Sequence, residues 1–257
     1  WRFGYQAVGV FQIALAACFA LTLARWTQSG PAPTSGSPGA APEKRLTEYR
    51  TPMGATLRQP AAWLSVLLFF LYVGAEGGLG TWTYTLLTES RGIDPTVAGF
   101  FAGSYWFTFT IGRILAGVIA RRVGGTALVL GGLIGALLGA GLLVWNPFEL
   151  ANVVAVGIIG ISIAPIFPAM MSGTRARVGD QHAANTIGMQ MTATGFGNAV
   201  IPSLMGVLAS RISLEIIPLF LLAVYAGLFG LNLFAARLRP APAEPAAAGL
   251  ERVETAG

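Results

Sequence analysis

Residues 61–87, AAWLSVLLFFLYVGAEGGLGTWTYTLL, form an apolar run that contains one charged residue, Glu76. About 20 apolar residues in a helix are enough to cross a bilayer, because the hydrocarbon core is about 30 Å thick and each residue rises about 1.5 Å. The run is too long, and too rich in Leu, Ala and Gly, to be an alternating strand of a membrane barrel. It therefore predicts a transmembrane helix with one carboxylate near its middle.

The rest of the chain repeats this pattern. Of its 257 residues, 54% are hydrophobic and 11% are charged, where a soluble domain carries roughly 25% charged residues. In hydrocarbon every backbone N–H and C=O must be paired within the protein, which long helices achieve. We therefore predict an all-α membrane protein. Seven runs qualify as spans, at about residues 3–24, 61–87, 97–120, 126–145, 150–171, 184–209 and 214–236.

Two segments differ from these runs in composition. The 34 residues between the first two runs, from Trp26 to Gln59, include SGPAPTSGSPGAAPEKR, which predicts a flexible linker. A short surface helix is expected within it, around Glu43 to Arg50. The residues after Leu238, RPAPAEPAAAGLERVETAG, predict a disordered tail. The remaining connections between runs are short.

The basic residues predict the orientation of the chain in the membrane. The net charge of +5 and the pI near 9.9 do not point to nucleic acid, because the basic residues lie at the ends of apolar runs. Eleven fall on one side and three on the other, which is the positive-inside pattern. The linker and tail are therefore expected to be cytoplasmic, in a plasma membrane or a bacterial inner membrane. The predicted parts are a transmembrane helix (1–25), a linker (26–59), a six-helix transmembrane bundle (60–237) and a tail (238–257).

Glu76 is the first candidate for function. An ionised acid at the centre of a membrane helix costs roughly 2.5–3.5 kcal/mol, and such residues generally mark substrate or ion pathways. Gly74, Gly77, Gly78 and Gly80 surround it and allow another backbone or a ligand to approach closely. We therefore interpret Glu76 as a substrate-binding or proton-coupling carboxylate. The alternative is an acid paired with a neighbouring helix for packing specificity.

A second candidate set is polar. Gln190, Thr194 and Asn198 recur every fourth residue in MQMTATGFGNAVIP, so they share one face of the sixth run. Such a face can line a cavity and hydrogen-bond a hydroxylated ligand. Equally, residues of this kind commonly join helices to one another. The sequence leaves both interpretations open.

Aromatic and basic residues of the third run complete the candidates. Tyr105 and Trp106 lie deeper than an interfacial aromatic belt would, so a platform for stacking a sugar is a candidate role. Arg113, in IGRILAG, lies about two turns before Arg121. We favour a structural or gating role for Arg113 over contact with substrate, and we assign the same kind of role to Arg121 and Arg122. A salt bridge between Arg113 and Glu76 would need matching depths, and counting along the spans does not match them.

No pattern in the chain points to catalysis. His182, in the fifth connecting loop, has no acid or cysteine near it and is interpreted as a loop residue. Cys18 is the single cysteine, which excludes a disulfide framework and a paired-cysteine metal site. No stretch resembles a nucleophile elbow, a phosphate loop or a zinc cluster. We therefore expect no enzyme activity, no metal and no cofactor apart from a coupling proton or sodium ion.

Several stretches together resemble one family. They are LRQPAAW leading into FLYVGAEGGLGTWTY, AGFFAGSYWFTFTIGRILAG followed by RRVGG, GISIAPIFPAMMS, and GNAVIPSLMGVLA, and they span nearly all of residues 57–236. The chain resembles the C-terminal half of a major facilitator superfamily transporter, with its first span similar to helix six of twelve. Within that superfamily it looks most like the fucose-permease-like branch, which includes sugar permeases. One departure is that Arg121, four residues after Gly117, stands where the family's loop motif has an acid.

The resemblance implies a function. It implies a secondary active transporter that moves a small polar solute, such as a sugar, by alternating access, with a proton or sodium as coupling ion. The solute cavity would lie between two halves, lined here by the spans that hold Glu76, Tyr105 and Gln190. The expected partners are the lipid bilayer and the N-terminal half of the same protein, with the whole acting as a monomer.

Two other classes remain as alternatives. A seven-helix receptor fits the number of spans but not the long first linker. A retinal-binding version needs a lysine within a helix, and the only lysine, Lys44, lies in the linker. An integral-membrane enzyme would need a buried cluster of His, Cys or carboxylates, and the sequence shows none.

Overall fold

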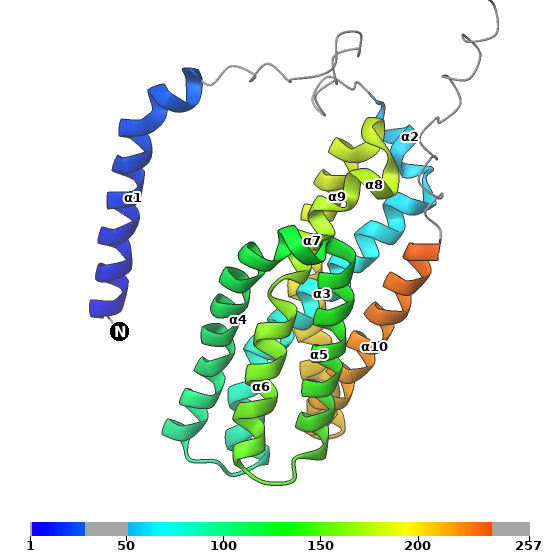
Figure 1. Ribbon diagram of the computed structural model, residues 1–257. Coiled ribbons are helices and arrows are strands. Elements are labelled where there is room, and N and C mark those ends of the chain that lie inside the picture. The colour runs from blue at the N-terminus through cyan, green and yellow to red at the C-terminus, as the bar shows by residue number, and fades with distance from the viewer. Residues whose placement is uncertain (1, 29–50, 238–257) are drawn as a thin grey trace, which may run out of the picture. The chain divides into compact units, whose positions relative to one another are not determined.

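The computed structural model describes residues 2–28 and 51–237 (Figure 1). These residues belong to two compact units. Helix α1 (Arg2–Gln28) belongs to the first unit, and it is apolar over Phe3–Leu23 with its described side chains exposed or half-exposed. The surface helix expected at 43–50 and the tail 238–257 lie outside the described residues.

The second unit is a bundle of helices. A single π-helical turn, Leu86–Ser90, extends α3 at its C-terminal end. The α-helices of the bundle are α2 (Met53–Leu57), α3 (Pro60–Thr85), α4 (Pro95–Val123), α5 (Gly125–Trp145), α6 (Leu150–Ile163), α7 (Ile166–Ser172), α8 (Thr174–Val178), α9 (Asp180–Arg211) and α10 (Ile216–Arg237). The prediction of an all-α fold is confirmed for the described residues.

Each predicted span corresponds to a helix or a pair of helices. Six segments of the described chain are long and apolar enough to cross a membrane: Phe3–Leu23, Pro60–Ser90, Gly125–Trp145, Leu150–Ser172, Asp180–Arg211 and Ile216–Arg237. Helix α4 is 29 residues long but is not among these six, and it carries Arg113 and several Ser and Thr residues. These polar residues keep it below the apolar character of the other six segments.

The fifth expected span is broken into α6 and α7. The break lies at Ala164 and Pro165, between Ile163 and Ile166. Proline has no N–H, so Pro165 and Pro168 cannot donate to the carbonyls of Ile161 and Ala164, one turn earlier. The break therefore leaves backbone acceptors in the interior of the bundle.

Capping residues define both ends of α4. At its start, the Asp94 side chain accepts hydrogen bonds from the backbone nitrogens of Thr96 and Val97, at 2.8 and 3.3 Å, and Pro95 takes the first helical position. At its end, Gly124 has φ of 80°, in the left-handed region that favours glycine, and α5 begins at the next residue. The connection between α4 and α5 is therefore a single residue.

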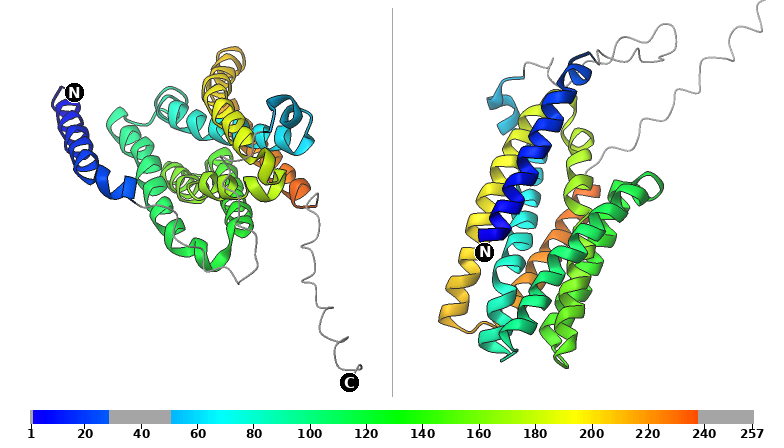
Figure 2. Two further views of the ribbon diagram at one scale, coloured as in Figure 1. Left: turned by 90° about the horizontal axis from the view of Figure 1, so that it is seen from above. Right: turned by 90° about the vertical axis from the view of Figure 1, so that its left-hand side faces the viewer.

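The helices pack in a fixed set of pairs. Helix α3 lies along α9, α4 lies along α6, and α5 packs against α6 and α10, which also contacts α3 (Figure 2). Between them lies one large apolar core, in which Phe69, Tyr72, Leu133 and Ile159 are fully buried. Helix α3 is thus enclosed by α4, α9 and α10, and side chains from its middle point into this core.

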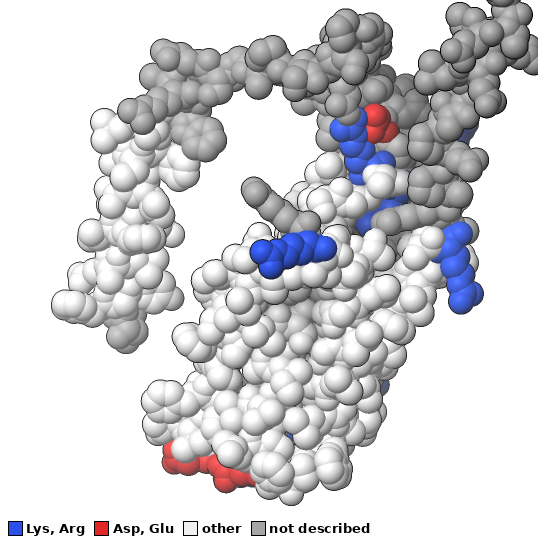
Figure 3. All heavy atoms as spheres, in the orientation of Figure 1, with Lys and Arg blue, Asp and Glu red and all other residues white. Residues whose placement is uncertain are grey.

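The outer surface is apolar in the middle and charged at the ends. Large apolar side chains such as Phe100, Phe107 and Leu138 are exposed, which is expected where the surrounding medium is lipid. On the face shown in Figure 3, most basic side chains gather at one end and most acidic ones at the other. We call the first the basic end; it carries Arg122, Arg175, Arg177 and Arg237.

At the opposite end, Arg91 joins four parts of the bundle. Its guanidinium forms a bidentate pair with the Glu215 carboxylate, at 3.0 and 2.7 Å, and donates to the Leu143 carbonyl at 2.8 Å and to Asn152. Ser90 also donates to Glu215, at 2.9 Å. The Arg91 side chain is only 5% exposed. Arg91 thereby connects α5, α6 and the residue before α10 to the loop that follows α3.

We predict that Arg91→Ala lowers the melting temperature of the purified protein. The change removes hydrogen bonds to a charged donor, worth about 1.5–3 kcal/mol each in favourable cases, and a loss of about 2 kcal/mol corresponds to roughly 4–8 °C. Circular dichroism in detergent measures the effect. Arg211→Ala, an exposed arginine at the same end, is the matched control and should melt like wild type. Equal melting of the two variants would contradict a stabilising role for Arg91.

The effect of this substitution should also depend on pH. The hydrogen bond from Arg91 holds the pKa of Glu215 below its ordinary value, although partial burial acts in the opposite direction. A carboxyl group with a lowered pKa contributes stability above the pKa of the unfolded chain, about 4.3, and this is lost as the pH falls through the folded value. The difference in melting temperature between wild type and Arg91→Ala should therefore narrow below about pH 4.

The interpretation of His182 as a loop residue is wrong. His182 lies in the first turn of α9 and is 6% exposed, and its Nδ1 lies 3.0 Å from Oγ1 of Thr56 in α2. Asn185 donates to the same hydroxyl oxygen at 3.0 Å and to the Thr51 carbonyl at 3.0 Å. His182 and Asn185 therefore connect the segment before α3 to α9 through side-chain hydrogen bonds.

Candidate functional site

Glu76 lies in the middle of α3, and its carboxylate turns partly into the bundle. Its Oε2 atom is buried and has no hydrogen-bond partner. Among the described residues only one other buried side-chain oxygen or nitrogen lacks a partner, the Tyr225 hydroxyl. Buried polar atoms are nearly always paired, because an unpaired one costs about 1–3 kcal/mol. The two exceptions therefore require an explanation.

Three buried tyrosines surround this carboxylate. Tyr72 lies one turn before Glu76 on α3, Tyr105 comes from α4, and Tyr225 comes from α10. Each is fully buried, and each interacts electrostatically with Glu76. We call Glu76 and these three residues the Glu76 cluster.

The hydroxyl protons of two of these tyrosines are already engaged. Tyr72 donates to the carbonyl of Ile163 at 3.0 Å, at the break between α6 and α7. Tyr105 donates to the backbone carbonyl of Glu76 at 3.1 Å. Tyr72 also lies close to the Glu76 carboxylate, but its single proton is directed to Ile163. The buried Oε2 atom of Glu76 thus lies among phenols without a hydrogen bond from any of them.

This arrangement suits the binding and release of a proton. A buried ionised carboxylate without a donor is costly, and binding a proton removes its charge. The charged group that acts on Glu76 is Arg113 of α4, which forms no ion pair with it among the described side chains. Instead, the Arg113 guanidinium carbon lies 4.6 Å from the centre of the Phe109 ring.

The glycines around Glu76 bring helices together. A Cβ atom at Gly74 would lie 2.9 Å from the carbonyl oxygen of Gly197 in α9, and one at Gly197 would lie 3.0 Å from the carbonyl carbon of Phe70. A Cβ at Gly77 would collide with the side chain of Asn198. In this structure the close approach predicted at these glycines is therefore made by another helix.

The three polar residues of α9 have different surroundings. Gln190 is fully buried, and its amide exchanges hydrogen bonds with the Thr174 hydroxyl of α8, at 3.0 and 3.2 Å. The Thr194 hydroxyl donates to the Met191 carbonyl of its own helix, at 2.7 Å. Asn198 is exposed, beside Gly77 of α3. Only Asn198 thus lies next to the segment that carries Glu76, and Gln190 serves here to join helices.

The predicted aromatic pair is divided between the interior and the surface. Tyr105 is buried in the Glu76 cluster, whereas Trp106 is 51% exposed. Their rings meet edge to face with centroids 4.7 Å apart. The Trp106 ring also packs beside Gly80, where a Cβ atom would lie 2.9 Å from its Cζ2. Of the two, Trp106 is the residue that can offer a ring face to a solute.

The predicted basic residues lie toward the basic end. Arg113 is exposed and lines a groove of about 450 Å³ between α4, α5 and α7, together with Pro165 and Pro168. Arg122 is exposed near the end of α4, and the side chain of Arg121 lies outside what the structure describes. The structural or gating role assigned to these arginines stays a prediction.

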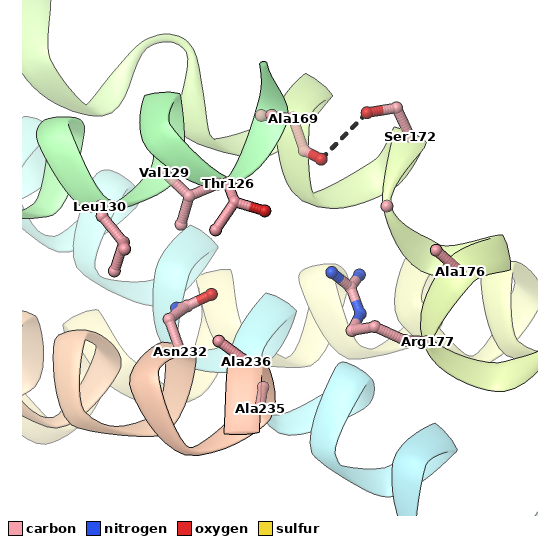
Figure 4. A pocket seen from close by; sticks show the side chains of 12 residues that line it. Thr126, Val129, Leu130, Ala169, Ser172, Ala176, Arg177, Asn232, Ala235 and Ala236 are labelled. Carbon is pink, nitrogen blue, oxygen red and sulfur yellow. Dashed lines mark hydrogen bonds between the residues drawn. The ribbon is translucent and has the colours of Figure 1, made fainter. Parts of the chain in front are cut away.

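A smaller hollow of about 210 Å³ lies at the basic end, between α5, α7, α8 and α10. Arg177 and Asn232 face it from opposite sides, and the Ser172 hydroxyl at its rim donates to the Ala169 carbonyl at 3.0 Å (Figure 4). The Arg177 guanidinium also donates to Ser65 at 3.1 Å. None of the predicted site residues lines this hollow, so it is separate from the Glu76 cluster.

Sequence reasoning missed two members of the cluster. Tyr72 carries a usable signal, because a residue four positions before Glu76 lies on the same face of the helix. Tyr225 carries none, since it is one tyrosine in an apolar helix and its electrostatic interaction with Glu76 depends on how α10 packs. In the described part of the chain no group of three or more His, Cys, Asp or Glu side chains could hold a metal ion.

The membrane-spanning helices and the buried acid define the class: this is a multi-pass α-helical membrane protein. The chain matches the family model of the Major Facilitator Superfamily over residues 2–188 and 83–256. Because these matches cover nearly the whole chain, it belongs to that superfamily. The family assignment confirms the resemblance seen in the sequence, and it gives no support to a seven-helix receptor.

Three relatives give a finer comparison. Bypass of stop codon protein 6 of Saccharomyces cerevisiae is 28% identical over 184 residues, 63% of this chain and 35% of that protein. An uncharacterized MFS-type transporter of Yersinia pestis is 24% identical, over 65% of this chain and 45% of that protein. Sodium-dependent glucose transporter 1A of Mus musculus is 31% identical, over 56% of this chain and 34% of that protein. The chain thus spans between a third and a half of the length of these relatives.

Proposed function

We propose that this chain is part of a secondary active transporter that moves a small polar solute of the sugar class, coupled to protons, by alternating access. Membership of the Major Facilitator Superfamily supports the transport activity. The likeness to a mouse protein whose name describes a glucose transporter supports the class of solute. The proposal includes an N-terminal half that completes the cavity, and a monomeric whole.

The observation that carries the proposal is the buried Oε2 atom of the Glu76 carboxylate, which has no hydrogen-bond partner. A metal ion bound by oxygens needs several ligands, whereas a proton needs one acceptor. Only Glu76 Oε2 and the Tyr225 hydroxyl are unused among the buried side-chain polar atoms that the structure describes. The cluster therefore suits a proton better than sodium.

The solute would bind on the exposed side of α3, α4 and α9. Asn198 and Trp106 are the predicted residues exposed there, one on either side of the segment with Glu76. An amide can hydrogen-bond the hydroxyl groups of a sugar, and an indole ring can stack on its apolar face. The basic end would face the cytoplasm, as the positive-inside rule predicts.

The first test uses the full-length protein in two steps. A thermal-shift screen against sugars, amino acids and drugs selects a solute, because a ligand stabilises the state that it binds. Proteoliposomes then receive either a proton gradient or a sodium gradient, and uptake of that solute is measured. One pH unit stores about 1.4 kcal/mol, so it should drive up to about tenfold accumulation at one proton per solute.

The two gradients separate the possible outcomes. We expect accumulation with an inward proton gradient and only equilibration with a sodium gradient. Accumulation driven by sodium alone would exclude proton coupling, and equilibration under both gradients would exclude active transport. Selection of only amino acids or drugs in the screen would exclude the sugar class.

A further inference from the structure

The second unpaired buried group is the starting point. The Tyr225 side chain is fully buried on α10, yet its hydroxyl has no hydrogen-bond partner among the described residues. Phenylalanine would fill an apolar site equally well without leaving a polar group unpaired. The hydroxyl therefore requires a partner that is absent in this arrangement of the bundle.

The candidate partner is Glu76. Helix α10 packs against α3, and Tyr225 interacts electrostatically with the Glu76 carboxylate. The protons of Tyr72 and Tyr105 are engaged by backbone carbonyls, at 3.0 and 3.1 Å. Tyr225 is consequently the one tyrosine of the Glu76 cluster whose proton is free to be donated.

We propose that Tyr225 is the positioning residue that donates a hydrogen bond to Glu76 when this carboxyl group releases its proton. The proton leaves Glu76 for water, and the phenolic proton stays on Tyr225, so that no bond of the tyrosine is broken. The state described here is the one in which the Glu76–Tyr225 hydrogen bond is open. A small shift of α10 against α3 closes it and stabilises the ionised carboxylate. This inference rests on the proposed function of Glu76 as the proton-coupling residue.

Few other groups can donate a hydrogen bond to the ionised carboxylate of Glu76. On α4 the neighbours are Tyr105, whose proton is engaged, and Arg113, which forms no ion pair with Glu76. Helix α9 carries no titratable side chain between His182 and Arg211, and α10 carries none but Tyr225 before Arg237. The described parts of α5, α6 and α7 carry none either. Apart from Tyr72, whose hydroxyl lies close to the Glu76 carboxylate but donates to Ile163, Tyr225 is therefore the side-chain donor available to the charged form of Glu76.

A consequence is that Glu76 releases its proton inside the helix bundle, away from the exposed residues proposed to bind solute. Tyr225 is fully buried, whereas Asn198 and Trp106, the candidates for binding solute, are exposed. The proton would then bind on the buried side of α3, and the solute would bind on its exposed side. Movement of α10 relative to α3 would connect them, because it changes the partner available to Glu76.

The test measures the protonation of Glu76 directly, and no solute is needed. Infrared spectroscopy of the purified protein follows the stretching band of the protonated carboxyl group as the pH is raised. The band that disappears in Glu76→Gln identifies this residue. Tyr225→Phe should retain its proton to a higher pH, with the midpoint shifted up by about one to two pH units, as expected for loss of a hydrogen bond to a charged group. Tyr84→Phe, a partly exposed tyrosine of α3, is the matched control and should titrate like wild type.

The possible results test the Tyr225–Glu76 hydrogen bond independently of the proposed coupling role of Glu76. An unchanged or lowered midpoint in Tyr225→Phe overturns the inference, whatever the transport assays show. An upward shift supports it, even if Glu76→Gln turns out to accumulate solute normally, which would overturn the coupling role alone. Tyr225→Phe removes only an unpaired hydroxyl, so it should melt at or above the temperature of wild type, and a shift in midpoint cannot then be attributed to unfolding.

Discussion

Glu76→Gln is expected to abolish solute accumulation driven by a proton gradient while leaving expression and folding intact. Glutamine has nearly the same shape as glutamate but cannot bind and release a proton. Under a gradient of one pH unit the accumulation ratio should fall from up to about tenfold to about one. Facilitated equilibration of the same solute should remain, because the exposed residues proposed to bind it are unchanged. Uptake by the full-length protein in proteoliposomes measures both quantities.

The stability of this variant is part of the prediction. One oxygen of the wild-type carboxylate is buried without a hydrogen-bond partner, so replacement of the group by a neutral amide should not lower the melting temperature. Glu89→Gln removes an exposed acid from the π-helical turn at the end of α3 and is the matched control. It should accumulate solute like wild type. Normal accumulation by Glu76→Gln would eliminate coupling through this residue.

The spans and their order could be read from the sequence because the bilayer imposes a length. Each run of about 20 apolar residues had to be a helix, since hydrocarbon leaves no other way to pair the backbone. Glu76 stood out for the same reason, as one charge in a long apolar run. Breaks within a span are less visible. The division of the fifth span at Ala164 follows from Pro165 and Pro168, but proline also occurs in continuous membrane helices, and α9 continues past Pro202.

The surroundings of the polar residues on α9 could not be predicted, for a geometric reason. A helix has 3.6 residues per turn, so residues four apart differ by about 40° and residues eight apart by about 80°. Gln190 therefore reaches Thr174 of α8, while Asn198 lies beside Gly77 of α3. The spacing identified a shared face, but a face 80° wide can contact two different neighbours.

Contacts between distant segments were beyond the sequence altogether. Thr56 and His182 are 126 residues apart, and neither has a neighbour in sequence that marks it as a partner. The same holds for Tyr225 and Glu76, which approach because α10 packs against α3. Long-range pairs of this kind are decided by the packing of apolar faces, which one sequence does not reveal.

That packing depends on the closeness of α3 and α9, and Gly197→Ala tests it. The added Cβ would lie 3.0 Å from the carbonyl carbon and 3.2 Å from the Cα of Phe70, and it would collide with the carbonyl oxygen. These are backbone atoms, which cannot turn aside as a side chain can. The helices must therefore separate, and overpacking of this kind costs about 1–3 kcal/mol. We expect a lower melting temperature and, because α3 carries Glu76, a disturbed Glu76 cluster.

Gly195→Ala gives the opposite expectation and so sharpens the test. Nothing lies within 4 Å of a Cβ at Gly195, two residues earlier on the same helix. There the change should be neutral or stabilising by up to about 1 kcal/mol, since alanine favours the helix more than glycine does. The two variants should therefore differ by about 1–4 kcal/mol, or roughly 2–15 °C in melting temperature. Equal melting temperatures of the two variants would mean that moving α3 away from α9 does not destabilise the protein. Close packing at Gly197 could then not be what positions Glu76 among the tyrosines.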